Sequence, residues 1–214
     1  MRQGCLAAVL DAGRACGCRL EVCSPSPVDL PKDARNVPQS GSDFGSRLER
    51  AMRDAFARGA GPLLVVGTDV PALAARHLSR ALALLEDDPD RVVLGPSPDG
   101  GFYLLAVGRP IGNLEAATRW CGHGTLSGLL RSLRDAGRPV VLLEPLADLD
   151  RRADLESWLA ARPSREGLWR ALSLLLRQRL AETCRPFIPL RLGRPRPALA
   201  ACASGRSPPE FLLR

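Results

Sequence analysis

Apolar residues recur along this chain with two periods that alternate from one segment to the next. Apolar positions three and four apart, the period of an amphipathic helix, occupy residues 2–16, 43–59, 72–86 and 125–136. Short apolar runs typical of strands lie at residues 19–23, 62–67, 91–95, 99–108 and 138–145. The proline-rich residues 24–38 are interpreted as a loop. Strands that alternate with helices predict an α/β fold, in which helices cover both faces of a mostly parallel sheet.

One pair of predicted strands departs from this pattern. The strand at 99–108 follows the strand at 91–95 with almost no residues between them. Two parallel neighbours need a crossover of about a dozen residues or more. We therefore expect this pair either to be antiparallel or not to be direct neighbours, within an otherwise parallel sheet.

The chain changes character at Pro163. Residues 1–162 carry the alternating pattern and are expected to form one α/β domain. Residues 163–214 begin with one more amphipathic segment and continue as a stretch rich in arginine and proline that has no sustained period. This composition predicts a helix followed by a poorly ordered extension.

The composition is that of a globular protein. Hydrophobic residues make up 45% and charged residues 25%, and no apolar run approaches the ~20 residues that cross a bilayer. Asp11 and Arg14 interrupt the apolar stretch near the N-terminus, which is therefore interpreted as a helix rather than a signal peptide. The seven cysteines are scattered, only two histidines are present, and Cys16 and Cys18 lack the two-residue spacer of a usual zinc or redox pair. We expect reduced thiols in a cytoplasmic protein and no structural zinc site.

The net charge of +7 arises from arginine, because Lys32 is the single lysine of the chain. The basic excess is concentrated after residue 162. Such an extension can bind phosphate polymers without sequence specificity, but a solvated surface is the favoured interpretation. We expect no membrane span and no specific nucleic-acid partner.

Asp69 follows the apolar run at 62–67, between Gly67 and Pro71. In an open α/β sheet, ligands bind beyond the carboxyl ends of the strands. A carboxylate at that edge can hold a divalent cation such as Mg²⁺, with substrate phosphates supplying further oxygen ligands. The alternative is that Asp69 caps the helix that follows, since aspartate is a good N-cap.

Two further clusters precede or follow predicted strands. The sequence "GPSPDGGFYLL" places Asp99 and two glycines before a strand, either as part of a site or as a plain turn. The sequence "LADLDRRADL" places Asp148, Asp150 and Asp154 at a junction between a strand and a helix, where helix capping is the alternative.

A third cluster, "PQSGSDFGSRL" at residues 38–48, combines an amide, small residues and an acid immediately before a helix. Helix N-termini attract anions, and the Gln39 amide could form hydrogen bonds to the edge of a base. The alternative is a capped loop in which Asp43 is the cap.

The order and spacing of these clusters, with Trp120 between them, resemble a bacterial family of glycosyltransferase-like proteins related to cofactor guanylyl- and nucleotidyltransferases. In that family the stretches look like Q-x-G-x-D-L-G-x-R, G-S-D-x-P-x-L, G-P-x-x-D-G-G-Y-Y-L and D-V-D-T-x-x-D-L. The resemblance covers roughly residues 36–159. It implies a nucleotide-diphospho-sugar transferase fold of the glycosyltransferase-A type, which is a Rossmann-like mixed sheet.

The resemblance also implies roles for individual residues. Asp69 would bind the metal, Mg²⁺ or Mn²⁺, and Asp150 would be a second candidate ligand. Asp99, Gly100 and Gly101 would face the sugar or the acceptor. The nucleotide would lie against the third cluster, at Gln39, Gly41, Asp43, Gly45 and Arg47.

The chain departs from the family at two places. Family members begin with a buried strand and a loop of the type P-x-x-G-x-x-K-T-R-L, whereas this chain starts in the helix that should follow that loop. A missing central strand leaves backbone groups unpaired, so a truncated chain is favoured over a degenerate relative. In addition, Arg151 and Arg152 follow Asp150 where the family prefers threonine and proline.

Three functions remain open from the sequence. The leading hypothesis is a metal-dependent transferase that uses a nucleotide-activated sugar. A nucleotidyltransferase acting on a phosphorylated small molecule has the same fold, but it needs the absent basic loop even more, because it must position a triphosphate. The third hypothesis is an inactive relative that binds an acidic partner.

Overall fold

The alternation of helices and strands expected from the sequence is present in the protein. The computed structural model describes residues 2–59, 61–112, 114 and 119–148, together with the backbone of 188–191 and 210–213. The described helices are α1 (Arg2–Ala15), α2 (Phe44–Ala57), α3 (Ala75–Asp87) and α5 (Thr125–Asp135). The strands are β1 (Leu20–Ser24), β2 (Ala34–Pro38), β3 (Leu63–Val66), β4 (Val92–Pro96), β5 (Phe102–Val107), β6 (Val140–Leu142), β7 (Ile188–Arg191) and β8 (Glu210–Leu213).

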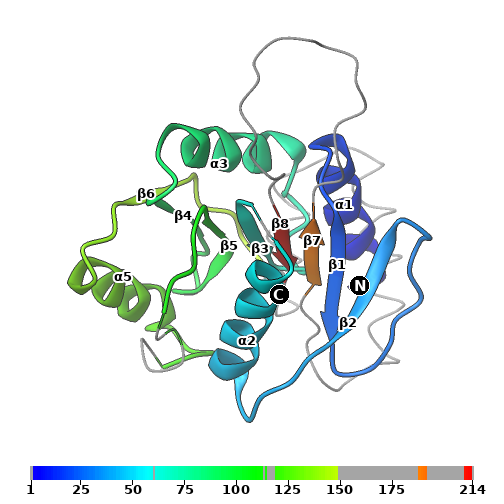
Figure 1. The fold of residues 1–214 in the computed structure, drawn as a ribbon, viewed down its shortest axis with the longest axis horizontal. Coiled ribbons are helices and arrows are strands. Elements are labelled where there is room, and N and C mark those ends of the chain that lie inside the picture. The colour runs from blue at the N-terminus through cyan, green and yellow to red at the C-terminus, as the bar shows by residue number, and fades with distance from the viewer. Residues whose placement is uncertain are drawn as a thin grey trace.

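The strands form a mixed arrangement of one larger and one smaller sheet (Figure 1). The six-stranded sheet has the order β6-β4-β5-β3-β7-β8, and the other sheet pairs β1 with β2. Strand β5 is antiparallel to both β4 and β3, whereas β4 is parallel to β6 and β1 is parallel to β2. The short connection between β4 and β5 therefore joins an antiparallel pair, and that alternative of the prediction is confirmed.

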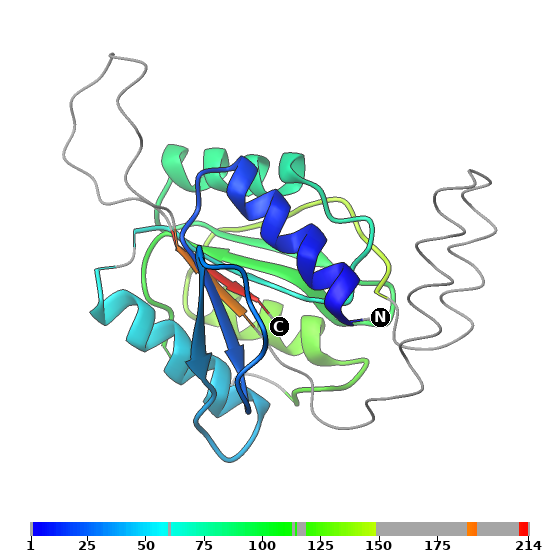
Figure 2. The same cartoon turned by 90° about the vertical axis from the view of Figure 1, so that its right-hand side faces the viewer.

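Helices cover both faces of the sheet, as Figure 2 shows, with α1 and α3 on one face and α2 and α5 on the other. Each face has its own apolar core: Leu78 of α3 belongs to the first, and Leu48 of α2 belongs to the second. Both leucines are fully buried. Truncating either to alanine would cost about 2–5 kcal/mol, the usual range for a core leucine. Within the described residues, no helix has the length and apolar character to cross a membrane.

Two elements differ from the prediction. Residues Ala34–Pro38, interpreted as loop, form β2, an edge strand whose only described partner is β1. Its residues are mostly exposed, and the Asn36 side chain exchanges two hydrogen bonds with the backbone of Val28, so no apolar run marks the strand. Helix α3 begins at Ala75, three residues later than expected, because Pro71 and its neighbours form turns instead.

Strand β3 is paired along both of its edges. One edge pairs with β5, and the other pairs with two strands from the C-terminal extension. Leu63 and Leu64 are in register with β8, whereas Val65 and Val66 are in register with β7. Figures 1 and 2 show both of these strands between β3 and β1. The sequence predicted unpaired backbone groups beside a missing central strand. On the side of β3 away from β5, such groups are paired with β7 and β8, which lie more than a hundred residues further along the chain. The rest of the extension, and the proposed boundary at 162, lie outside the described residues.

The direction of each β3 amide follows from one hydrogen bond. The Gly67 N–H donates to the Tyr103 carbonyl of β5 at 2.8 Å. Because backbone N–H groups alternate along a strand, the amides of Leu63 and Val65 face β5 as well. The amides of Leu64 and Val66 therefore face the two C-terminal strands.

This alternation gives a residue-specific test of the C-terminal strands. We expect deletion of residues 209–214, which removes β8, to increase the hydrogen-exchange rate of the Leu64 amide at least about tenfold, because that amide loses its strand partner. The amides of Leu63 and Val65 serve as internal controls, since their partners on β5 are unchanged. The lost ladder hydrogen bonds should lower the unfolding free energy by about 1–2 kcal/mol. Unchanged exchange at Leu64 would contradict the pairing of β8 with β3.

Candidate functional site

The carboxyl ends of β3 and β4 meet at the amino end of β5, because both strands are antiparallel to β5. Residues 67–69 follow β3, and residues 97–101 connect β4 to β5. We call these two segments together the sheet edge. The segment after β6 approaches the same place: Leu143 N–H donates to Leu94 O at 2.8 Å, and Leu146 N–H donates to Pro96 O at 3.1 Å. Three segments distant in sequence therefore converge at one end of the sheet.

Asp69 lies at this edge and is partly exposed. A Cβ on Gly67 would be only 2.8 Å from Asp69 Oδ1, so the carboxylate occupies the space that a larger residue at position 67 would fill. The charge of Asp69 also reaches α1: burial, and then the Asp69 carboxylate, raise the pKa of Cys5 to about 11. Asp69 thus follows the end of β3 and is near enough to Cys5 of α1 to act on its pKa.

Asp69 does not cap α3, so this alternative interpretation is wrong. The N-cap position is Ala74, whose N–H donates to His77 Nδ1 at 2.9 Å. The other ring nitrogen of His77 lies 2.7 Å from Glu144 Oε1, and the Tyr103 hydroxyl donates to the Glu144 carbonyl at 3.0 Å. The buried histidine therefore fixes the start of α3 to the segment after β6. That segment continues to Asp148, whereas Asp150 lies outside the described residues.

The turn at 97–101 joins β4 to β5 and is closed by its own hydrogen bonds. The Ser97 N–H donates to the Gly101 carbonyl at 3.0 Å, and the Gly101 N–H donates to Asp99 Oδ1 at 2.8 Å. Gly100 has φ +90°, and a Cβ there would lie 2.1 Å from the His123 carbonyl oxygen. Asp99 is exposed and stabilises the turn, as the plain-turn alternative expected.

The loop at 39–47, whose last four residues form the first turn of α2, is also organised by contacts within the protein. Gln39 Nε2 donates to the Cys23 carbonyl of β1 at 3.2 Å. Asp43 caps α2 by accepting the Ser46 N–H at 2.9 Å, and this backbone hydrogen bond lowers the pKa of the Asp43 carboxyl. Gly41, with φ +147°, approaches the backbone of Arg47 so closely that a Cβ would lie 2.7 Å from the Arg47 nitrogen. The capped-loop alternative therefore describes Asp43.

Trp120 connects this loop to the sheet edge. A Cβ on Gly45 would lie 2.3 Å from Trp120 Nε1, which donates to the Leu114 carbonyl at 3.1 Å. The indole also packs against Phe44 and Phe102, with ring centroids 5.4 and 6.2 Å away. Phe102 is the first residue of β5, so the predicted nucleotide loop and the turn at 97–101 are held near one another by this one aromatic side chain.

Sequence reasoning missed Ser97 as a residue of the edge. Its side chain is 5% exposed, and its hydroxyl has no hydrogen-bond partner among the described residues. A buried hydroxyl without a partner is unusual, and it marks a polar position at the edge. Nothing in the sequence distinguishes this serine from the turn residues beside it.

A metal at this edge would need ligands from beyond the described side chains. Within the part of the chain that the structure describes, no three His, Cys, Asp or Glu side chains gather closely enough to hold a metal ion. The donor chemistry at Asp69 still fits a hard cation, because Mg²⁺ is often held by one or two carboxylates and by substrate phosphates. The space over Gly67 accommodates such a carboxylate.

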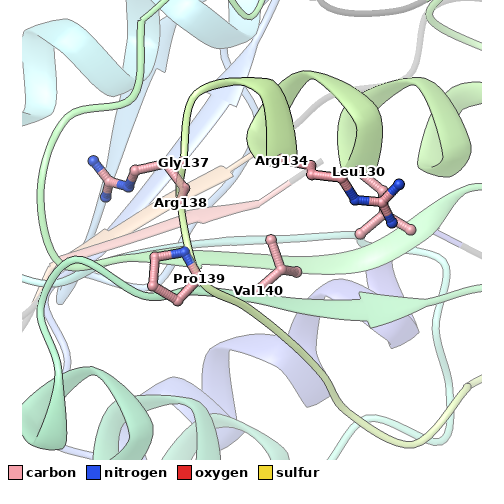
Figure 3. Close-up of a pocket in the computed structure, with 6 residues that line it drawn as sticks. All are labelled: Leu130, Arg134, Gly137, Arg138, Pro139 and Val140. Atoms are coloured by element: carbon pink, nitrogen blue, oxygen red, sulfur yellow. The ribbon is translucent and has the colours of Figure 1, made fainter.

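A hollow of about 390 Å³ lies elsewhere, between the end of α5 and β6 (Figure 3). Arg138 Nε donates to the carbonyl of Asp90, just before β4, at 2.9 Å, so the hollow lies near the amino ends of β4 and β6, opposite the sheet edge. None of the predicted site residues lines it. The lining residues are Leu130, Arg134, Gly137, Arg138, Pro139 and Val140.

Comparison with known proteins bears on both the family and the fold. The family described as "Uncharacterized protein conserved in bacteria (DUF2064)" matches residues 11–121, just over half of the 214-residue chain. A crystal structure from Desulfovibrio desulfuricans G20, described as a "putative nucleotide-diphospho-sugar transferase", is 24% identical with a TM-score of 0.59. The match covers 73% of this chain and 72% of that chain. No curated protein matches the chain. The molecule thus has an α/β fold similar to that of this protein.

The close approach of Gly45 and Trp120 can be tested by substitution. We expect Gly45→Ala to lower the unfolding free energy by about 1–3 kcal/mol, because the new methyl group would overlap the indole. Thermal unfolding measures the change, and near-UV circular dichroism reports the displaced tryptophan. Gly112→Ala is the matched control, since a Cβ there meets nothing within 4 Å. Equal stability of the two variants would contradict this packing.

Proposed function

The chain belongs to the DUF2064 family of bacterial proteins, and we propose that it is a metal-dependent transferase that uses a nucleotide-activated sugar. The observation that carries the proposal is Asp69, a partly exposed carboxylate at the sheet edge with space made for it by Gly67. The α/β fold, similar to that of the protein described as a "putative nucleotide-diphospho-sugar transferase", supports the same function. In detail, we propose the glycosyltransferase-A type of Rossmann-like sheet.

In this proposal Asp69 holds Mg²⁺ or Mn²⁺, and Asp150 supplies a second ligand from the segment that follows Asp148. The path of the chain after β6 supports these two ligands. Hydrogen bonds from Leu143 and Leu146 to β4 hold this segment beside β4 as far as the sheet edge. The bound cation would shield negative charge on the departing nucleoside diphosphate. Asp69 would act by holding this cation at the sheet edge, beside the turn assigned to the sugar or the acceptor.

The nucleotide is assigned to the loop at 39–47, next to the edge. The Gln39 amide is held in place by its bond to Cys23, which leaves its oxygen available for a base edge. The Arg47 guanidinium has a buried Nε with no hydrogen-bond partner among the described residues, as expected of a group that pairs with a ligand. Gly41 and Gly45 shape the loop, and Asp43 acts through its cap of α2.

The sugar or the acceptor is assigned to the turn that carries Asp99, Gly100 and Gly101. This turn faces solvent at Asp99, and its conformation is fixed by the hydrogen bond within it and by the contact of Gly100 with His123. A fixed turn beside Asp69 provides the pre-organised geometry that transfer requires. The reaction would break the bond between the anomeric carbon and phosphate and form a bond to the acceptor oxygen, whose proton is released.

Binding can be measured by thermal shift with a panel of nucleotide sugars and nucleoside triphosphates, with and without Mg²⁺ or Mn²⁺. We expect a nucleotide sugar plus metal to stabilise the protein by about 2.7 kcal/mol at a hundredfold excess over the dissociation constant, which raises the midpoint by several degrees. Asp69→Asn should abolish the metal-dependent part of that rise, because the amide carries no charge to bind the cation.

Asp135→Asn is the matched control, since Asp135 is an exposed residue at the end of α5. It should respond to ligands as the original protein does. A response to triphosphates instead of nucleotide sugars would replace the proposal with a nucleotidyltransferase. The absence of any metal-dependent response, or an Asp69→Asn variant that responds fully, would contradict the proposed site.

A further inference from the structure

The sequence Cys16-Gly17-Cys18 forms the turn that ends α1. The Cys18 N–H donates to the Gly13 carbonyl at 3.0 Å, and the Gly17 N–H donates to the Arg14 carbonyl at 2.9 Å. This pair of bonds, with Gly17 at φ +68°, is the Schellman arrangement that commonly closes a helix. The left-handed glycine reverses the chain direction between the two cysteines. The turn therefore brings the two cysteines, separated by Gly17 alone, together at the end of α1.

The two sulfurs have different surroundings. Cys16 is half-buried, with its Sγ 3.3 Å from Ser79 Oγ and 3.5 Å from the Ala75 carbonyl of α3. The hydrogen bond from the Cys18 thiol, together with the bond from Ser79, lowers the pKa of Cys16 to about 6. Cys18 is buried, and burial raises the pKa of its thiol. The pair thus combines a half-buried sulfur whose pKa is lowered with a buried thiol whose pKa is raised.

We propose that Cys16 and Cys18 form a peroxide-reactive dithiol that closes to a disulfide within the turn. The Cys16 thiolate attacks one oxygen of a hydroperoxide, which gives a sulfenic acid on Cys16 and releases hydroxide or alkoxide. The Cys18 sulfur then attacks the Cys16 sulfur, forms the S–S bond and loses its proton, and water leaves. The peroxide is reduced by two electrons and the two thiols are oxidised by two. A small thiol reductant reverses the change.

The other described cysteines lack this combination. Cys5 and Cys23 are buried, and burial raises the pKa of each thiol. Cys121 is exposed, but no described cysteine lies beside it in the sequence to resolve a sulfenic acid. Reactivity toward peroxide depends on thiolate character as well as on exposure. Cys16 should therefore react before the more exposed Cys121.

Closure of the disulfide would alter the contact between α1 and α3. The Cys16 sulfur would turn toward Cys18 and away from Ser79 and the Ala75 carbonyl, the contacts that hold the end of α1 against the first turns of α3. The oxidised protein should accordingly be less stable than the reduced protein, even though a covalent bond has formed. This bond closes a loop of only three residues, so it constrains the unfolded chain little.

The test uses the full chain treated with a low concentration of hydrogen peroxide at neutral pH. Intact mass should fall by about 2 Da, and peptide mapping should place the disulfide between Cys16 and Cys18. Dithiothreitol should restore the mass. Oxidation at Cys16 should be at least about tenfold faster than at Cys121. Mapping also separates these products from any that involve Cys184 or Cys202, which lie outside the described residues.

Three variants make the outcome decisive, and thermal unfolding confirms that each is folded. Cys16→Ser should abolish the 2 Da loss, with mass measured as above. Cys18→Ser should stop at a sulfenic acid on Cys16 that dimedone traps, whereas Cys121→Ser should behave as the original protein. Faster oxidation of Cys121 than of Cys16, or a disulfide that still forms in Cys16→Ser, would overturn the proposal.

Discussion

The antiparallel insertion of β5 between β3 and β4 is the constraint on which the rest of the edge depends. Two strands that run in one direction, each paired with the same opposed strand, must place their carboxyl ends at its amino end. The bond from Gly67 to Tyr103 continues the ladder one residue past β3, so the chain turns away only at Asp69. If β3 and β4 ran in opposite directions instead, Asp69 and the turn at 97–101 would lie at opposite ends of the sheet. The position of Asp69 is therefore a consequence of strand direction rather than of local sequence.

Glycine next to a bulky group recurs around this edge and explains part of what makes the motifs recognisable. Gly45 lies against the Trp120 indole, Gly100 lies against the His123 carbonyl, and a Cβ on Gly95 would overlap the Tyr103 ring at 2.3 Å. The first two pairs join segments that are distant in sequence, and the third joins the neighbouring strands β4 and β5. The glycines of these motifs thus have a steric reason to be there that is independent of any ligand. A ligand-binding role for them would come from the loop shapes that the close approaches impose.

The parts of the fold that follow from local pattern could be read from the sequence, and those set by distant partners could not. The short connection before β5 excluded a parallel pairing with β4, because it leaves no room for a crossover, and only the structure separated an antiparallel pair from strands that are not neighbours. Strand β2 was missed since its residues face solvent, and only its hydrogen bonds to β1 make it a strand. The two interpretations of Asp69 could not be separated until the start of α3 was known, and that start depends on His77 and on Glu144, 67 residues further along. Ser97 became visible only through its burial.

The strands of the C-terminal extension link the far end of the chain to Asp69. Strand β7 pairs with Val65 and Val66, the residues that immediately precede Gly67. The end of β3, just before Asp69, is therefore paired on one side with β5 and on the other with β7. An edge with only β5 as a partner would leave the amide of Val66 unpaired in a position where β3 is fully buried, which costs about as much as a lost hydrogen bond. A strand paired with this side of β3 therefore helps to fix the position of Asp69 without contacting it. Because β3 is short, with four residues shared between two partners on that side, this contribution is made by few hydrogen bonds. The position of the Asp69 carboxylate consequently depends on the pairing of β7 and β8 with β3, although these strands lie more than a hundred residues further along the chain.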